Sequence, residues 1–202
     1  MSLTRSHDGL QATEPDFRRP EGREAKRREL LKELLPQLAR VGILGNADNP
    51  FLEVALKNLH RTAEQLRVAL DLVEVRNSDQ IEGALLRLDQ ARPDAVLVSA
   101  DTLLLTKRNE IAAALARSRL PAVYPYREYV AAGGLIVQGA NFGVLFERAA
   151  GYVDRILNGA RPADLPIQLA TEFELIINLK TAAAIGLNIL ATLIARADEV
   201  IE

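Results

Sequence analysis

The 202-residue sequence contains no cysteine and only two histidines. Disulfide bonds, thiolate metal sites and a cysteine nucleophile are therefore excluded, and so are zinc sites built mainly from histidine. The 25 Lys and Arg residues nearly balance the 27 Asp and Glu residues, which leaves a formal net charge of -2. This balance argues against a protein that binds nucleic acid by neutralising phosphates.

Long hydrophobic runs are also missing. One of the longest apolar stretches, Thr181 to Ala195, is broken by Gly186 and Asn188 and is too short to span a bilayer. Residues 1–22 lack the basic start and the apolar run of a secretion signal. We therefore expect either a protein that stays inside the cell or an exported protein whose leader lies outside this sequence.

What the sequence does contain is a regular alternation of short apolar runs and helical segments. Four runs of strand length occupy Val41–Leu44, Leu70–Val75, Asp94–Ser99 and Pro121–Tyr124, with helical periodicity between them. Connections of this length make consecutive strands run parallel, and right-handed crossovers then place helices on both faces of the sheet. The predicted fold is α/β: a parallel, Rossmann- or flavodoxin-like sheet in three αβα layers.

The composition divides the chain into three parts. Residues 1–22 are polar, carry Pro15 and Pro20, and are expected to form a flexible arm. Residues 23–140 are expected to form the α/β ligand-binding lobe. Residues 141–202 contain a helix, a strand and terminal helices, and they either complete this lobe or form an oligomer interface.

Ligands of parallel α/β sheets bind at the C-terminal ends of the strands, and this rule selects four loops. In the first, Gly45–Pro50, backbone amides at a helix start suit a carboxylate or a phosphate; the alternative is a turn with Asn49 as cap. In the second, Asp101 can receive a ligand ammonium group and Thr102 can donate its hydroxyl, or Asp101 is a plain helix cap.

The third loop holds three of the four tyrosines, within Tyr124–Tyr129. Their rings can stack on a flat ligand, and the Arg127 guanidinium can bind a carboxylate with two hydrogen bonds. The alternative is that Tyr124 and Tyr129 pack in the core while Arg127 pairs with Glu128. In the fourth loop, Gln138–Asn141, the amides face the same crevice, or the segment is a turn and a cap.

Motifs of catalysis are missing from the sequence. There is no GxxxxGK[ST] loop, no GxGxxG after the first strand and no GxSxG elbow. His60 falls in the middle of a predicted helix and has no nucleophile paired with it in the sequence. We expect no catalytic residues, no cofactor and no metal.

Six segments, taken in order, resemble the substrate-binding proteins of ABC transporters with the type I periplasmic-binding fold, a family that includes tryptophan- and tyrosine-binding members. The resemblance runs from about Arg23 to Glu202. It implies a clamp that captures a small solute, such as an amino acid or another carboxylate, and presents it to an ABC permease. The segments are residues 26–36, 41–50, 120–135, 152–166, 173–183 and 195–202.

The resemblance also implies roles for individual residues. The loop after the first strand corresponds to the part that meets the ligand carboxylate, Asp101 and Thr102 correspond to the amino-group site, and the segment after the fourth strand completes it. The candidate ligand-binding residues are Asn46, Asp48, Asn49, Asp101, Thr102, Tyr126, Arg127 and Glu128.

Family members carry most of an N-terminal lobe ahead of this region, and the resemblance implies that this lobe is missing here. We expect the segment from Leu179 onward to expose apolar surface, which predicts a homodimer or a C-terminal third that packs on its own sheet. The resemblance implies a periplasmic location, with a cytoplasmic one still open. The alternative function is an interaction or regulatory module that binds no small molecule.

Overall fold

A computed structural model describes residues 30, 32–166 and 172–202. The arm predicted for residues 1–22 lies outside the described residues. Among the described residues, seven strands form one sheet in the order β2-β1-β3-β4-β5-β6-β7. The strands are β1 (Arg40–Asn46), β2 (Ala69–Val75), β3 (Ala95–Val98), β4 (Ala122–Tyr124), β5 (Ile136–Ala140), β6 (Phe173–Asn178) and β7 (Glu199–Ile201).

The predicted α/β architecture is confirmed, with one difference at the C-terminal side of the sheet. Strands β1 to β5 pair in parallel, whereas β6 runs antiparallel to β5 and β7 runs parallel to β6. The last two strands therefore point the opposite way. The short strand β7 was not expected, because three residues after a turn carry too little periodicity to be recognised.

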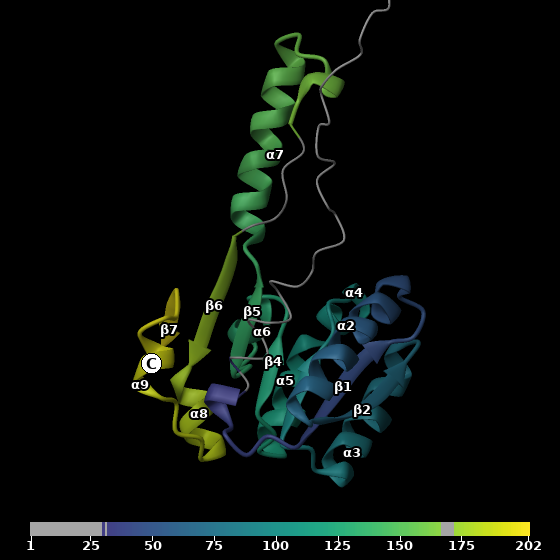
Figure 1. Ribbon diagram of the computed structural model, residues 1–202, viewed down its shortest axis with the longest axis vertical. Helices are drawn as coiled ribbons and strands as arrows, with labels where there is room; N and C mark the ends of the chain where they lie inside the picture. Colours follow the sequence, from purple (N-terminus) through teal and green to yellow (C-terminus); the bar gives the residue numbers. More distant parts are fainter. Residues whose placement is uncertain (1–29, 31, 167–171) are drawn as a thin grey trace, which may run out of the picture.

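The helices lie mainly on the two faces of the sheet (Figure 1). They are α2 (Pro50–Leu66), α3 (Ile81–Ala91), α4 (Thr102–Thr106), α5 (Arg108–Arg117), α6 (Glu128–Ala131), α7 (Phe142–Leu157), α8 (Leu179–Ile185) and α9 (Ala191–Ile194), with 3-10 turns at Ser78–Gln80 and Pro162–Asp164. The helical segment between the third and fourth strands consists of two helices, because the chain leaves helical geometry at Lys107.

Two apolar clusters fill the layers between sheet and helices. One joins the sheet to α3, α4, α5 and α6. The other joins it to α2, α8 and α9 and to Leu30, Leu34 and Leu38 ahead of β1. Most of the large apolar side chains from Leu179 onward pack here, including Ile185, Ile189 and Leu193. The apolar surface expected from Leu179 onward is thus largely covered by the sheet of the same chain.

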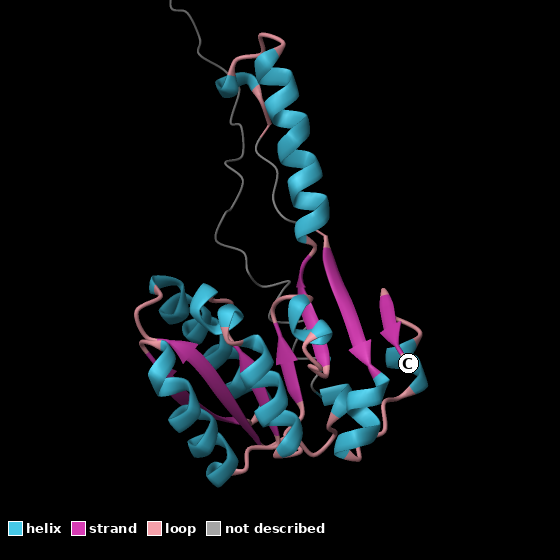
Figure 2. Cartoon of the chain, turned by 180° about the vertical axis from the view of Figure 1, so that it is seen from behind, coloured by secondary structure: helices cyan, strands magenta, loops and turns pink. Residues whose placement is uncertain are grey.

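Helix α7 is the exception to this layered arrangement. It begins at Asn141, whose side-chain Oδ1 accepts a hydrogen bond from the backbone N–H of Val144 at 3.2 Å. From there it projects away from the end of the sheet (Figure 2). No helix in the described part of the chain is long and apolar enough to cross a membrane.

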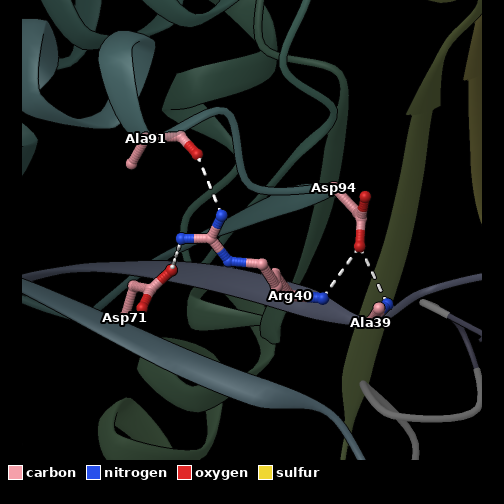
Figure 3. Close-up of polar contacts among 5 residues, drawn as sticks. All are labelled: Ala39, Arg40, Asp71, Ala91 and Asp94. Atoms are coloured by element: carbon pink, nitrogen blue, oxygen red, sulfur yellow. Dashed lines mark hydrogen bonds and ion pairs between the residues drawn. The ribbon is translucent and has the colours of Figure 1, made fainter.

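A polar cluster around Arg40 lies at the N-terminal ends of the strands, away from α7 (Figure 3). The Arg40 guanidinium donates to the Asp71 carboxylate at 2.7 Å and to the Ala91 carbonyl at 3.2 Å. The Asp94 carboxylate accepts from the backbone N–H groups of Ala39 and Arg40, both at 2.8 Å. These contacts hold the starts of β1, β2 and β3 together.

Replacing Asp94 tests this cluster. In Asp94→Ala two backbone donors lose their acceptor, and we expect the free energy of unfolding to fall by roughly 1–2 kcal/mol. Urea titration followed by circular dichroism measures the change. Asp94→Asn retains an acceptor oxygen and serves as the control, so equal losses in both variants would contradict this role.

Candidate functional site

The C-terminal ends of β1, β3, β4 and β5 meet at one edge of the sheet, and a concave pocket of about 390 Å³ lies there. Because β6 runs antiparallel, its first residue, Phe173, lies beside Ala140 at the same edge. The lining includes the aromatic side chains Phe51, Tyr126, Phe142 and Phe173, the aliphatic side chains Ile43, Leu52, Val54, Leu59 and Leu97, and the polar residues Asn49, Asn58, Ser99 and Gln138.

Close backbone packing forms one wall of this pocket. A Cβ atom added to Gly139 would lie 1.9 Å from the carbonyl oxygen of Pro125. Only glycine allows the end of β5 to approach the loop after β4 this closely. Gly139 therefore lies directly against Pro125, and both residues line the pocket.

Aromatic rings lead out of the pocket toward α7. The ring centroids of Tyr126 and Phe142 are 5.8 Å apart, and those of Phe142 and Phe146 are 6.4 Å apart. Such distances and tilts are those of favourable aromatic pairs. An apolar concave surface with rings along one side is suited to a small ligand with a flat apolar part.

At the polar side of the edge, Asp101 connects two of the predicted loops. Its Oδ2 atom accepts from the side-chain amides of Asn46, at 3.1 Å, and Asn49, at 2.9 Å. Its Oδ1 atom accepts from the backbone N–H of Leu104 at 3.3 Å and so caps α4. Asp101 is 8% exposed, and these three donors stabilise its carboxylate where water is largely excluded.

Asn49 has contacts on both sides. Its Oδ1 accepts from the backbone N–H of Phe51 at 3.0 Å, which caps α2, and its amide also donates to the Ala100 carbonyl at 3.2 Å. Asn49 therefore joins the pocket wall to Asp101. The sequence left open whether Asn49 caps a helix or contacts a ligand. The two roles are compatible, since Asn49 caps α2 and also lines the pocket.

The other predicted residues lie farther from this centre. The Asp48 carboxylate pairs with Arg76, while Thr102 and Glu128 are exposed. Of the eight candidates, the pocket lining includes Asn49 and Tyr126. Asn46 and Asp101 adjoin it through their hydrogen bonds to the loop.

The tyrosine loop separates into buried and accessible rings. Tyr124 and Tyr129 stack in the core with centroids 4.6 Å apart, and burial raises the pKa of both phenols. Tyr126 is partly exposed and lines the pocket. The alternative pairing of Arg127 with Glu128 is wrong: Arg127 donates to Glu199 of β7 at 2.6 Å.

Arg127 also lies 4.0 Å from the carboxylate of Glu174 in β6. Burial raises the pKa of Glu174; the nearby charge of Arg127 opposes this shift, and the carboxylates of Glu199, Asp198 and Glu128 add to it. Arg127 is thus engaged by two strands that run opposite to the rest of the sheet. This contact is between residues far apart in sequence, so spacing alone could not reveal it.

The pocket lining contains residues that the sequence analysis missed, among them Phe51, Val54, Phe142 and Phe173. Phe51 and Phe142 stand at helix starts, which was an available signal. Phe173 depends on the antiparallel pairing of β6 and could not be placed from the sequence. Among the described residues there is no group of three or more His, Asp or Glu side chains that could hold a metal ion.

Comparison with known proteins decides the family. A family model of ABC transporter substrate-binding proteins matches residues 23–201. The chain belongs to this family. The predicted resemblance is therefore confirmed for nearly the whole described chain.

Individual relatives of this substrate-binding chain are distant. A tyrosine-binding protein of Clostridioides difficile (strain R20291) is 22% identical over 160 residues, covering 79% of this chain and 46% of that protein. Among solved structures, a conserved domain protein from Vibrio cholerae has a TM-score of 0.80 at 22% identity, covering 88% of this chain and 60% of that one. An ABC domain from Streptococcus pneumonia, in complex with L-Trp, has a TM-score of 0.79 at 21% identity, covering 89% and 62%.

These similarities establish the fold. The chain spans about half the length of the curated relative and about 60% of the solved structures.

Replacing Asp101 tests its role in holding the two loops. In Asp101→Ala the cap of α4 and both asparagine contacts are lost, and we expect the free energy of unfolding to fall by roughly 1–3 kcal/mol. If Asp101 only contacted a ligand, the substitution would leave the free energy of unfolding nearly unchanged. Chemical denaturation measures the loss. Thr102→Ala, at the exposed neighbouring residue, serves as the control. A loss no greater than that of the control would contradict the bridging role.

The raised pKa of Glu174 predicts a pH dependence of stability. The folded state binds this proton more tightly than the unfolded state, so this residue favours folding at acid pH. Its contribution is lost as pH rises through the raised pKa. We expect Glu174→Gln to gain stability relative to the wild type between about pH 4 and about pH 7. Urea titrations across that range measure the difference, which would stay constant if Glu174 had its ordinary pKa.

Proposed function

We propose that this chain is the solute-binding component of an ABC-type uptake system and that its pocket takes a small carboxylate of the aromatic amino acid class. The observation that carries the proposal is the apolar pocket at the C-terminal edge of the sheet, bordered by Tyr126 and Phe142 on one side and Asn49 on the other. The relatives that are tyrosine-binding or complexed with L-Trp support the same ligand class.

The charges at this edge suit the two ends of an amino acid. The buried Asp101 carboxylate, which Asn46 and Asn49 hold in place, attracts an ammonium group. The start of α2 supplies the positive end of a helix dipole for a carboxylate. The side chain then lies among the rings of the pocket.

The proposed activity is binding without catalysis, and the proposed partner is an ABC permease. The proposal places the chain on the outer side of the cytoplasmic membrane, in the periplasm. The sequence offered a homodimer as one of two alternatives, on the ground of apolar surface from Leu179 onward, and the sheet of the same chain covers most of that surface. The proposal keeps the homodimer on a different ground, the exposed Phe146 and Leu157 of α7.

A second candidate is an interaction or regulatory module without a small ligand. The exposed apolar face of α7 favours it, because such surfaces commonly mark protein contacts. Isothermal titration with L-Trp and L-Tyr separates the two candidates. Saturable heat supports the solute-binding proposal, and no heat at any accessible concentration supports the module.

Tyr126 provides a sharper test of the pocket. Removing its ring in Tyr126→Ala takes away a stacking surface, and we expect the binding free energy for L-Trp to weaken by roughly 1–3 kcal/mol. Tyr126→Phe keeps the ring and should bind nearly as the wild type does. Calorimetric titration of the three proteins measures this. Unchanged affinity in Tyr126→Ala would place the ligand elsewhere.

A further inference from the structure

Arg127 directly follows Tyr126, yet the two side chains have different surroundings. Tyr126 lines the pocket and packs against the apolar cluster that joins the sheet to α6. The guanidinium of Arg127 donates to the Glu199 carboxylate at 2.6 Å, and its Nε atom lies 4.0 Å from the Glu174 carboxylate. The described lining of the pocket contains Tyr126 but not Arg127. The arginine therefore binds protein carboxylates beside the pocket and not a group inside it.

The contacts of Arg127 join segments that are not neighbours in the sheet. Arg127 lies at the start of α6, in the loop after β4, whereas Glu174 belongs to β6 and Glu199 to β7. Strand β5 lies between β4 and β6 (Figure 1). A loop at the end of a strand is the part of a fold that moves most easily. One side chain thus ties such a loop to two strands of the sheet.

The backbone around Arg127 forms the first turn of α6. The backbone N–H of Tyr129 donates to the Tyr126 carbonyl at 3.1 Å, and that of Val130 donates to the Arg127 carbonyl at 3.0 Å. This helix has four residues, and its N-cap residue, Arg127, makes no side-chain hydrogen bond to it. A helix this short is not stable by itself. The ion pairs of Arg127 therefore help to decide where the turn, and with it Tyr126, lies.

The two carboxylates around Arg127 differ in how much water reaches them. The side chains of Arg127 and Glu199 are 56% and 49% exposed, whereas that of Glu174 is 9% exposed. An ion pair between two exposed side chains is screened by water and salt and holds a loop weakly. A carboxylate that is largely shielded from water attracts the guanidinium more strongly at the same distance. Glu174 is therefore the part of this network that distinguishes it from an ordinary surface ion pair.

The charge of Glu174 is costly for the fold. Burial raises the pKa of Glu174, and the charge of Arg127 opposes this rise. The other carboxylates that face Glu174 add to the rise; they are Glu199, Asp198 and Glu128. Above this pKa the ionised side chain disfavours folding, a cost that a neutral side chain of the same shape would not have. Residues that lower stability in this way are commonly kept for a function.

We infer that Arg127 is a positioning residue: held by Glu174 and Glu199, it fixes the loop after β4 so that the Tyr126 ring forms a wall of the pocket, and it does not touch the ligand. This inference rests on the proposed function for the meaning of the pocket. It differs from the role expected from the sequence, in which the Arg127 guanidinium binds a ligand carboxylate. Both roles predict weaker ligand binding when Arg127 is replaced, so the experiments have to separate an effect through Tyr126 from a direct contact.

A double-mutant cycle makes this separation. The wild type, Arg127→Ala, Tyr126→Ala and the double variant are titrated with L-Trp in a calorimeter. We expect Arg127→Ala to weaken binding by about twofold to thirtyfold and to have almost no further effect once the Tyr126 ring is gone, because residues that act through one another are not additive. Losses that multiply in the double variant indicate a direct contact between Arg127 and the ligand and overturn the inference. Unchanged binding by Arg127→Ala also overturns it.

Glu174→Gln provides a readout that a purely structural role would not move. The variant loses the buried charge, so at about pH 7 we expect a gain in stability in urea titration together with a Kd for L-Trp that rises by about threefold or more. Glu202→Gln removes an exposed carboxylate just after β7 and should change neither quantity. A Glu174→Gln protein that binds L-Trp as tightly as the wild type does overturns the inference.

Hydrogen exchange tests the anchoring of the loop without a ligand, and so separates this inference from the proposed function. The amides of Tyr129 and Val130 report on the first turn of α6. We expect NMR to show faster exchange of both amides in Arg127→Ala and wild-type rates in Glu202→Gln. Unchanged rates in Arg127→Ala overturn the inference and leave the proposed function intact. A wild type that binds neither L-Trp nor L-Tyr overturns the proposed function, whereas faster exchange in Arg127→Ala still supports the anchoring of the loop by Arg127.

Discussion

The antiparallel pairing of β5 with β6 determines where α7 and one wall of the candidate pocket lie in this structure. The chain leaves the sheet at Ala140 and returns at Phe173, and these two residues face each other in the ladder. Residues 141–172 therefore begin and end at one point on the C-terminal edge. That constraint places the base of α7 beside the pocket and brings Phe173 into the lining.

The edge has two parts with different physical character. On one side, the Asp101 carboxylate accepts three hydrogen bonds, two from the loop after β1 and one from α4, which satisfy its oxygens where little water reaches them. On the other side, apolar side chains and rings surround the pocket. Together they present a charge and an apolar surface a short distance apart, as recognition of a small amphipathic solute requires.

The sheet is well covered, and α7 is not. Both faces of the sheet carry apolar clusters that include the C-terminal helices, so the exposed apolar surface is concentrated elsewhere, on α7 and on the α2 side of the pocket.

The sequence by itself determined the α/β layers and the parallel order of the first strands, and it predicted a site at the C-terminal ends of those strands. These follow from local periodicity, the length of crossovers and the helix caps at Asn49 and Asn141. It also identified Asn49, Asp101 and Tyr126, since each follows a strand that had been recognised.

Only the tertiary structure decided the reversed direction of β6, the pairing of Arg127 with Glu199 and the inclusion of Phe173 in the pocket. Each is a contact between residues far apart along the chain, and periodicity carries no information about such partners. The exposure of α7 was hidden for the same reason. Its amphipathic pattern shows that one face is to be buried, but only packing shows that nothing in the described part of this chain buries it.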